Sequence, residues 1–204
     1  MHEILLTKPD DAELLNDMFA FRKKIFLDKL NWEVSHYNGL EIDYFDTLQP
    51  TYIVSRAKNI GVNGCWRFLP TTGPYMLQSI FPELLRGEAA PQDELVWEIS
   101  RFAVDAHMAN SYQQAAIHPV TVQMLKKGYE VAMENQIQQF VAVTSVAMER
   151  LLKKLGIPMQ RFGDQKSTRV GRVNSVACWI EVNEQYRRAV DSHEAMLNTY
   201  QEVA

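Results

Sequence analysis

The sequence predicts an α/β fold, in which helices cover both faces of one mixed sheet as a three-layer α/β/α sandwich. Two observations lead to this prediction. In the second half of the chain, apolar runs of strand length alternate with longer segments that have helical periodicity. In the first half, two strand-like segments are joined by a turn rich in Asn and Gly, which is typical of an antiparallel hairpin. A sheet that combines a hairpin with helical crossovers is mixed.

Length and composition indicate one globular domain. The chain has 204 residues, of which 47% are hydrophobic and 23% charged, as in ordinary soluble domains. Its 21 Lys and Arg against 25 Asp and Glu give a net charge of -4, which argues against attraction of the whole surface to nucleic acid but not against a local basic patch. No nucleic-acid partner is expected.

Two further features indicate the cellular compartment in which the protein is expected. No apolar run approaches the roughly 18 to 20 residues of a transmembrane helix, and the N-terminal segment does not resemble a signal peptide. Cys65 and Cys178 lie far apart and form no disulfide framework. We therefore expect a cytoplasmic protein with no membrane association.

The first element is a predicted helix. Asp10 and Asp11 can cap its start, and the apolar residues that follow have helical spacing. Arg22 is four residues from both Met18 and Phe26, so we expect this arginine on the same inward-facing stripe.

The rest of the first half alternates predicted loops and strands. Residues 31–50 are polar and have no clear period, so we expect a long loop. Residues 51–56 and 64–70 predict the two strands of the hairpin. A second loop, over residues 70–94, leads into a strand that contains WEISRF, residues 97–102.

The second half is more regular. Residues 118–136 predict a helix with Pro near its start, and residues 138–145 predict a buried strand. Residues 145–156 predict a helix that stops at a Gly, and residues 174–182 predict a further strand. A polar helix is expected from about residue 184.

Charged residues in apolar or aromatic surroundings are the candidates for a functional site. Three are cationic and three anionic, so together they can form a neutral cluster: Arg22, Asp43, Asp46, Arg67, Glu98 and Arg101. Buried charges persist when paired, and loss of one partner costs about 3 to 5 kcal/mol. From the residues alone, a network that only holds the 31–50 loop in place explains the pattern equally well.

The spacing of Glu98 and Arg101 predicts a distorted strand. Residues three apart in a regular strand point to opposite faces. The two side chains can share one cluster only if a bulge lies between them, and bulges are common beside active sites.

At these residues the chain resembles a known family, the acyl-homoserine lactone synthases, which are the autoinducer synthases of bacterial quorum sensing. The resemblance covers most of the first 105 residues, through FRKKIF, LNW, GLEIDYFD, CWRFLPTTGPYML and WEISRFAVD. All eight positions of the family motif are present in order: Arg22, Phe26, Trp32, Asp43, Asp46, Arg67, Glu98 and Arg101. The second half resembles the family more weakly, mainly in VTSVAMERLLKKLG.

The resemblance implies an N-acetyltransferase-like fold with a twisted mixed sheet. It also implies a single synthase domain over residues 1–204, with the S-adenosylmethionine and catalytic side up to about residue 105. Residues 106–204 would then form the acyl-chain and acyl-carrier side. S-adenosylmethionine is a substrate in this family, and no cofactor is expected. The usual acetyltransferase phosphate loop is absent, which fits acyl carrier protein as the acyl donor.

The resemblance also implies roles for the motif residues. Glu98 is the candidate base and, with Arg101, the candidate catalytic pair. Arg22 and Arg101 would bind either the carboxylate of S-adenosylmethionine or the carboxylates of the loop, since the guanidinium fork suits carboxylates. Phe26 and Trp32 would line the S-adenosylmethionine pocket, although core packing explains Phe26 in part.

The remaining motif residues, Asp43, Asp46 and Arg67, would hold the loop in an ion cluster. Thr144 lies where a hydroxyl in this family accompanies selection of 3-oxo-acyl groups. A hydrogen bond from a buried Thr to the backbone is an equally good interpretation.

Three cations at residues 145–156 are candidates for docking the acyl carrier protein: Arg150, Lys153 and Lys154. A solvated helix end explains them about as well. The family also includes enzymes that use acyl-coenzyme A, and a non-catalytic binding protein on the same scaffold is a further alternative. The histidines (residues 2, 36, 107, 118 and 193) and the cysteines have no metal-ligand spacing, so no metal is expected. Acyl length, 3-position oxidation and oligomeric state stay open.

Overall fold

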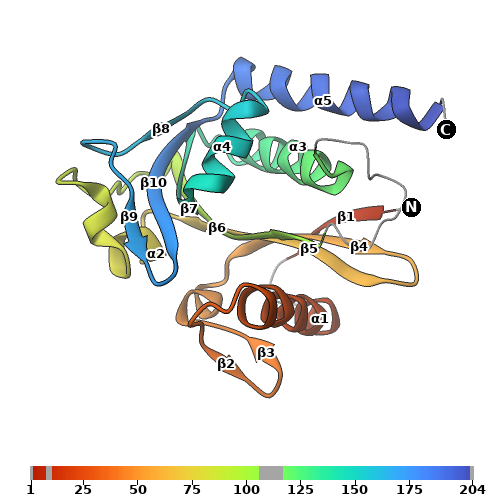
Figure 1. Ribbon diagram of the computed structural model, residues 1–204, viewed down its shortest axis with the longest axis horizontal. Coiled ribbons are helices and arrows are strands. Elements are labelled where there is room, and N and C mark those ends of the chain that lie inside the picture. Colours follow the sequence, from red (N-terminus) through yellow and green to blue (C-terminus); the bar gives the residue numbers. More distant parts are fainter. Residues whose placement is uncertain (1, 8–10, 106–116, 203–204) are drawn as a thin grey trace. The chain divides into compact units, whose positions relative to one another are not determined.

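The computed structural model describes residues 2–7, 11–105 and 117–202, without the side chains of residue 2 and of residues 198–202. The chain forms two compact units that interleave along the sequence (Figure 1). Unit 1 comprises Met1–Phe68 and Arg101–Met124, and unit 2 comprises Leu69–Ser100 and Leu125–Ala204.

An antiparallel sheet is the base of unit 1. Its strands are β1 (His2–Thr7), β4 (Thr51–Ala57) and β5 (Gly61–Pro70), of which the last two residues belong to unit 2. The predicted hairpin of β4 and β5 is confirmed. The sequence does not indicate β1, because its short apolar run ILL does not alternate with polar residues.

The first helix begins where the sequence predicts. In α1 (Ala12–Arg22), the carboxylate of Asp11 accepts a hydrogen bond from the backbone N–H of Leu14 at 3.1 Å. The helix then continues as a π-helix, η1 (Lys23–Lys29), in which hydrogen bonds span five residues instead of four. Sequence periodicity does not distinguish the two helix types over so short a segment.

The predicted loop over residues 31–50 is wrong in part, because it contains regular structure. Strands β2 (His36–Tyr37) and β3 (Leu40–Glu41) form a small hairpin, which lies beside α1 in Figure 1. Its turn is Asn38-Gly39, with φ of 49° and 82°, and Asn-Gly is the strongest short hairpin signal. A 3₁₀-helix, η2 (Tyr44–Leu48), follows.

The core of unit 1 is made by α1, η1, β4, β5 and the end of β6. The buried residues that form it are Leu14, Leu15, Met18, Phe21, Ile25, Phe26, Tyr52, Val54, Cys65 and Ala103. The inward stripe that the sequence predicts for the first helix is therefore confirmed, and Arg22 lies on it with no exposed surface.

Unit 2 contains the parallel part of the fold. Strand β6 (Val96–Val104) begins in this unit and pairs in parallel with β7 (Gln139–Ser145) from Val96 to Glu98. Strand β10 (Val173–Glu181) is antiparallel to β7, and the short strands β8 (Met159–Arg161) and β9 (Thr168–Val170) pair with β10. The predicted strands β6, β7 and β10 are confirmed.

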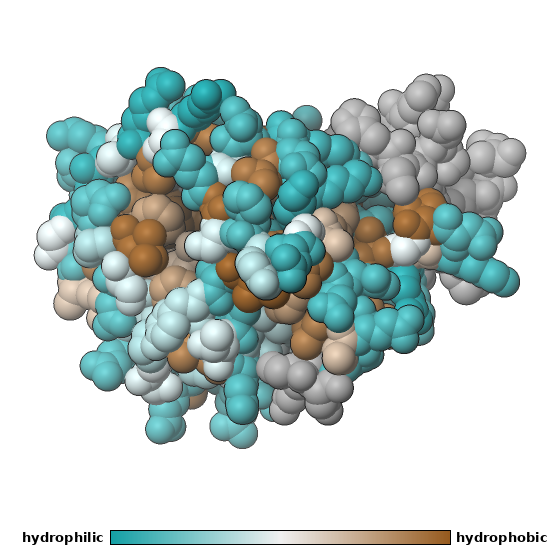
Figure 2. All heavy atoms as spheres, turned by 90° about the horizontal axis from the view of Figure 1, so that it is seen from below, coloured by the Kyte–Doolittle hydropathy of each residue, from teal (hydrophilic) through white to brown (hydrophobic). Residues whose placement is uncertain are grey.

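The predicted helices of the second half are also confirmed. They are α3 (Pro119–Glu134), which enters unit 2 at Leu125, α4 (Val146–Lys154) and α5 (Glu184–Glu202). The predicted loop over residues 70–94 contains two short helices, α2 (Met76–Ser79) and η3 (Pro82–Leu85). Of the helices described, none is both long and apolar enough to cross a membrane. Figure 2 shows a largely hydrophilic face with smaller hydrophobic areas.

Candidate functional site

The site is built around a buried ion cluster in unit 1. It contains five of the six charged residues that the sequence singles out, namely Arg22, Asp43, Asp46, Arg67 and Arg101, together with Glu41. Three guanidinium groups face three carboxylates in these ion pairs. The third carboxylate is Glu41, which the sequence analysis missed, although its position two residues before Asp43 in an extended segment is a usable signal.

Arg22 ties α1 to the segment that follows the β2–β3 hairpin. Its Nε donates to Glu41 Oε2 at 2.5 Å, and its two terminal nitrogens bind Asp46 in a fork at 2.7 and 3.0 Å. The side chains of Arg22 and Glu41 have no exposed surface. This arrangement favours the loop-holding role for Arg22 over direct contact with a ligand.

Asp43 and Asp46 also set the local backbone. Asp43 caps η2 by accepting from the N–H of Phe45 at 2.9 Å, and Asp46 accepts from the N–H of Asp43 at 2.8 Å. This reciprocal arrangement is a capping box. Arg67, on β5, donates to both aspartates at 2.6 and 2.8 Å, so it holds the capped helix to the sheet. The Tyr52 hydroxyl donates to Asp46 at 2.8 Å.

Arg101 forms the exposed edge of the cluster. It donates to Glu41 at 3.0 Å and to Asp43 at 2.8 Å. Its side chain is 10% exposed and that of Asp43 is 12% exposed, whereas Arg22 and Arg67 are at 0%. Arg101 is therefore the guanidinium in the cluster that a ligand can reach.

The backbone of Arg101 has the distortion that the sequence predicts. Its φ is 56°, in the left-handed region, within a segment that is otherwise extended. Non-glycine residues adopt such values rarely, and they concentrate at functional sites. The carbonyl of Arg101 accepts a hydrogen bond from the Cys65 thiol at 3.2 Å.

Electrostatics keep the carboxylates of Glu41 and Asp46 ionised. Burial by itself raises the pKa of Glu41, but the charges of Arg101 and Arg22 more than offset it, and the pKa lies below its usual value. Burial also opposes ionisation of Asp46, and Arg22 and Arg67 lower the pKa of that carboxyl well below its usual range. The cluster is a set of paired charges at neutral pH.

Glu98 lies in unit 2 and has a different environment. It is buried, and its carboxylate accepts hydrogen bonds from the backbone N–H groups of Met76, at 2.9 Å, and Leu77, at 2.7 Å. Both donors belong to the first turn of α2. The nearby Tyr75 hydroxyl donates to the carbonyl of Pro91 at 2.7 Å. Each oxygen of Glu98 thus accepts from one of these two backbone N–H groups.

The two motif aromatics pack against each other in unit 1. The rings of Phe26 and Trp32 are stacked with centroids 5.2 Å apart, and the Arg101 guanidinium carbon lies 5.6 Å from the Phe26 ring centroid. Phe26 is buried in the core, as the packing interpretation requires, whereas Trp32 is half-buried. Trp32 is the aromatic side chain that retains surface for a ligand.

The predicted acyl-side residues lie in unit 2. Thr144 is half-buried on β7, opposite Val176, and its hydroxyl makes no hydrogen bond to any residue that the structure describes. The alternative of a Thr bonded to the backbone therefore has no support within the described chain.

The three cations of α4 are all exposed, but they are not equivalent. Lys153 donates to the buried carboxylate of Glu149 at 2.8 Å. Glu149 also accepts two hydrogen bonds from Arg161. These bonds are the main reason why the pKa of Glu149 is lowered to about 2. Within the described residues, Arg150 and Lys154 form no ion pair, so these two cations are available to a partner.

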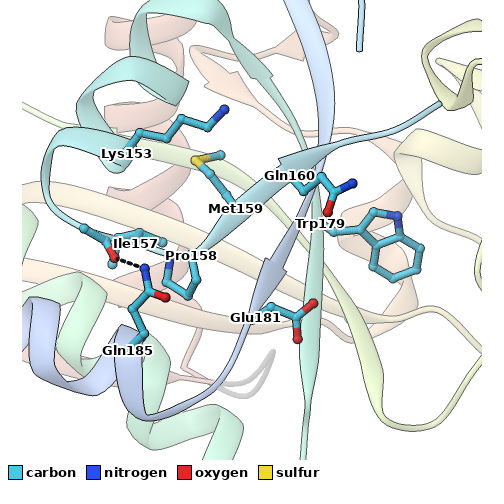
Figure 3. A pocket seen from close by; sticks show the side chains of 9 residues that line it. Lys153, Ile157, Pro158, Met159, Gln160, Trp179, Glu181 and Gln185 are labelled. Carbon is cyan, nitrogen blue, oxygen red and sulfur yellow. Dashed lines mark hydrogen bonds between the residues drawn. The ribbon is translucent and has the colours of Figure 1, made fainter. Parts of the chain in front are cut away.

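A pocket of about 470 Å³ opens in unit 2 at the end of α4. In Figure 3, Lys153 from α4, Gln160 from β8, and Trp179 and Glu181 from β10 surround it. Gln185 closes one side by donating to the carbonyl of Gly156 at 3.1 Å. The motif residues do not line this pocket.

Among the residues that the structure describes, no group of three or more His, Cys, Asp or Glu side chains could hold a metal ion. His107 lies outside the described residues.

Comparison with known proteins yields a consistent set of matches. Residues 7–190 match the family model described as autoinducer synthase. An acyl-homoserine-lactone synthase of Vibrio anguillarum is 39% identical over 175 residues, which cover 86% of this chain and 90% of that protein.

Solved structures agree with the sequence matches. The crystal structure of the AHL synthase LasI has a TM-score of 0.83 at 32% identity, over 94% of this chain and 95% of that one. TofI in a ternary complex with an inhibitor and MTA has a TM-score of 0.78 at 29% identity, over 94% and 96%. A protein described as an N-acetyltransferase from Lactobacillus plantarum has a TM-score of 0.59 at 14% identity, over 89% and 99%. The predicted N-acetyltransferase-like fold is confirmed.

Proposed function

We propose a reaction for this chain, which belongs to the autoinducer synthase family and is an acyl-homoserine-lactone synthase. The chain transfers an acyl group from acyl carrier protein to the amine of S-adenosylmethionine, and the product closes to a lactone with release of methylthioadenosine. The observation that carries the mechanism is the position of Arg101. It is the partly exposed cation of the cluster, and it follows Glu98 by three residues in β6.

The first step forms an amide. The ammonium group of S-adenosylmethionine loses one proton to Glu98, directly or through water. The amine then attacks the thioester carbonyl carbon, a C–N bond forms, and the C–S bond breaks with its electron pair on sulfur. The second amine proton passes to this thiolate.

The second step forms the lactone. The carboxylate oxygen attacks the carbon attached to the sulfonium, a C–O bond forms, and the C–S electrons return to sulfur as neutral methylthioadenosine leaves. This step needs the carboxylate held in a fixed direction. In the proposal, Arg101 binds that carboxylate, and Arg22, Asp43, Asp46 and Arg67 hold the surrounding segment.

The assignment of Glu98 is supported by its fixed position between two backbone N–H groups. Glu98→Gln should abolish acylation by the purified enzyme while it still binds S-adenosylmethionine in calorimetry. The matched control is Glu94→Gln, an exposed carboxylate just before the same strand, which should be fully active. If Glu98→Gln unfolds, Glu98→Asp withdraws the carboxylate by one methylene and should lower kcat. Wild-type kcat in Glu98→Gln would refute the role.

Binding of S-adenosylmethionine is proposed to involve Trp32 directly and Phe26 indirectly. The half-buried Trp32 ring offers an aromatic face to the sulfonium, whereas Phe26 supports both Trp32 and Arg101 from the core. Trp32→Leu should therefore raise the KM for S-adenosylmethionine and leave the KM for the acyl donor unchanged.

Acyl selection is proposed to involve Thr144. Its half-buried hydroxyl can donate to a 3-oxo group, since no described residue takes that hydrogen bond. Thr144→Val keeps the shape and removes the donor, so kcat/KM should fall about tenfold for a 3-oxo-acyl donor and stay constant for the unsubstituted one. An equal effect on both donors would remove Thr144 from the selection.

The donor is proposed to be acyl carrier protein, an acidic partner that docks on Arg150 and Lys154, with Lys153 beside them. The purified enzyme should turn over acyl carrier protein donors with a lower KM than the matching acyl-coenzyme A. Arg150→Glu with Lys154→Glu should raise only the carrier-protein KM, and Lys58→Glu, an exposed control in unit 1, should change neither. A lower KM for acyl-coenzyme A would favour the coenzyme A-dependent alternative.

We also propose which part of the chain binds each substrate. Residues up to about 105 supply the S-adenosylmethionine and catalytic side, and residues 106–204 supply the acyl side. A cytoplasmic location remains a prediction; Cys65 and Cys178 are both buried free thiols.

A further inference from the structure

We propose that Asp105 is a positioning residue for the S-adenosylmethionine side of the reaction, acting through Lys24 and Lys29 on the π-helix η1. None of these three residues belongs to the motif positions. The inference rests on the proposed function, because it assumes that the aromatic residues next to η1 line the substrate pocket.

Asp105 is a buried carboxylate that two cations reach from η1. The residue is 3% exposed, and its carboxylate accepts from Lys24 Nζ at 3.0 Å and from Lys29 Nζ at 2.9 Å. The side chains of Lys24 and Lys29 are 46% and 39% exposed. The carboxylate is the desolvated partner, and the two lysines supply positive charge that favours its ionised form.

Asp105 is itself anchored to the sheet of unit 1. Its backbone N–H donates to the carbonyl of Asn63 on β5 at 2.9 Å, and the side chain of Asn63 accepts from Ser55 on β4 at 2.8 Å. Burial by itself raises the pKa of Asp105, but the bonds and charges of Lys29 and Lys24 lower it below its usual value. Asp105 is therefore a charged, fixed point opposite the helix.

The spacing of the two lysines fits a π-helix. Lys24 and Lys29 are five residues apart, whereas neighbours on an α-helix are three or four apart. In a π-helix the hydrogen bonds join residues five apart, as from the N–H of Leu30 to the carbonyl of Ile25 at 3.0 Å. A carboxylate that binds both lysines at once thus favours the π-helical register.

The register of η1 determines where the motif aromatics lie. Phe26 belongs to η1, and its carbonyl accepts from the N–H of Trp32 at 2.8 Å. The Trp32 ring stacks on Phe26, and Phe26 supports the Arg101 guanidinium. A shift of η1 to the α-helical register would rotate Phe26 and so disturb its contacts with both Trp32 and Arg101. Asp105 therefore sets the geometry of the proposed pocket without touching the substrate.

The experiment compares four variants. They are Asp105→Asn, the double variant Lys24→Gln/Lys29→Gln, the triple variant that combines these three substitutions, and one matched control. The control is Arg56→Gln, which removes an exposed ion pair to Glu3 elsewhere in unit 1. Steady-state kinetics give separate KM values for S-adenosylmethionine and the acyl donor. Hydrogen exchange of the peptide spanning residues 23–32 reports the order of η1 without reference to activity.

We expect Asp105→Asn to raise the KM for S-adenosylmethionine about threefold to tenfold, as suits the loss of two partly exposed ion pairs. The donor KM should stay constant, exchange in residues 23–32 should become faster, and the triple variant should match Asp105→Asn. Asp105→Glu should restore part of the affinity.

Two results would overturn the proposal. In the first, hydrogen exchange in residues 23–32 and the kinetic constants of Asp105→Asn are the same as those of Arg56→Gln. In the second, both KM values or kcat alone change, which indicates a general effect on the fold. Failure of the proposed function is recognised separately, because wild-type protein would then make no acyl-homoserine lactone while the exchange result still stands.

Discussion

The substitution Glu41→Gln tests the ion cluster most sharply, because it changes one charge and almost no volume. Glu41 accepts from Arg22 at 2.5 Å and from Arg101 at 3.0 Å, with no exposed side-chain surface. The substitution leaves three arginines against two aspartates in a buried site, and a Gln amide in contact with guanidinium donors.

The expected loss of stability in Glu41→Gln follows from the burial of its ion pairs. Removing one partner of a buried ion pair costs about 3 to 5 kcal/mol. At about 2 to 4 °C per kcal/mol for a chain of this size, Tm should fall by roughly 6 to 20 °C. The assay is thermal unfolding followed by circular dichroism, with urea unfolding for the free energy.

The matched control is Glu184→Gln in α5. Glu184 also accepts hydrogen bonds from two arginines, Arg187 and Arg188, but its side chain is 52% exposed. Exposed ion pairs contribute little to stability, so Tm should hardly change. If Glu41→Gln lowered Tm no more than Glu184→Gln, burial would not be what gives the cluster its strength.

Two other predictions concern stability. The pKa values of Glu41 and Asp46 are lowered in the folded state. Their stabilising contribution is therefore present above the unfolded pKa values of about 4 and is lost progressively as the pH falls below them. In urea unfolding measured from pH 7 to pH 3, the midpoint concentration of urea should decrease once the pH is below about 4. Gly163→Ala should lower Tm more than Gly171→Ala. Both glycines have positive φ, so the backbone strain is similar in the two variants. A Cβ at Gly163 would in addition lie 2.7 Å from the carbonyl oxygen of Arg86, whereas a Cβ at Gly171 would meet open space. Equal Tm losses would contradict the steric argument.

The fold was largely predictable because apolar runs and helical periodicity indicate which residues are buried. The strands β4, β5, β6, β7 and β10 are mostly apolar segments of strand length, and the helices α1, α3 and α4 have apolar residues at helical spacing. The elements that the sequence missed are short or lie at an edge. The hairpin turn at Asn38-Gly39 shows that a clear local signal can still be overlooked within a polar segment.

Most of the charged residues of the site could be predicted from the sequence, but the pairs that they form could not. A charge in an apolar stripe, such as Arg22, must be paired, so the existence of the cluster follows from the sequence. The identity of each partner depends on distances between segments far apart in the chain. The sequence analysis missed Glu41, which binds Arg22 and Arg101 in the cluster, and it did not identify the backbone of α2 as a donor to Glu98.

The most direct test of the central claim is the product itself. The protein would be expressed in a host that makes no lactones, and the culture extract examined by mass spectrometry, with Glu98→Gln and Glu94→Gln expressed in parallel. Growth on isotopically labelled methionine marks the part of the product that comes from S-adenosylmethionine.

We predict an acyl species with a labelled homoserine-lactone fragment from the wild type and from Glu94→Gln, and none from Glu98→Gln at equal levels of folded protein. The mass of the parent ion also gives the acyl length and its oxidation. An unlabelled lactone fragment, or the same yield from Glu98→Gln, would contradict the proposed reaction.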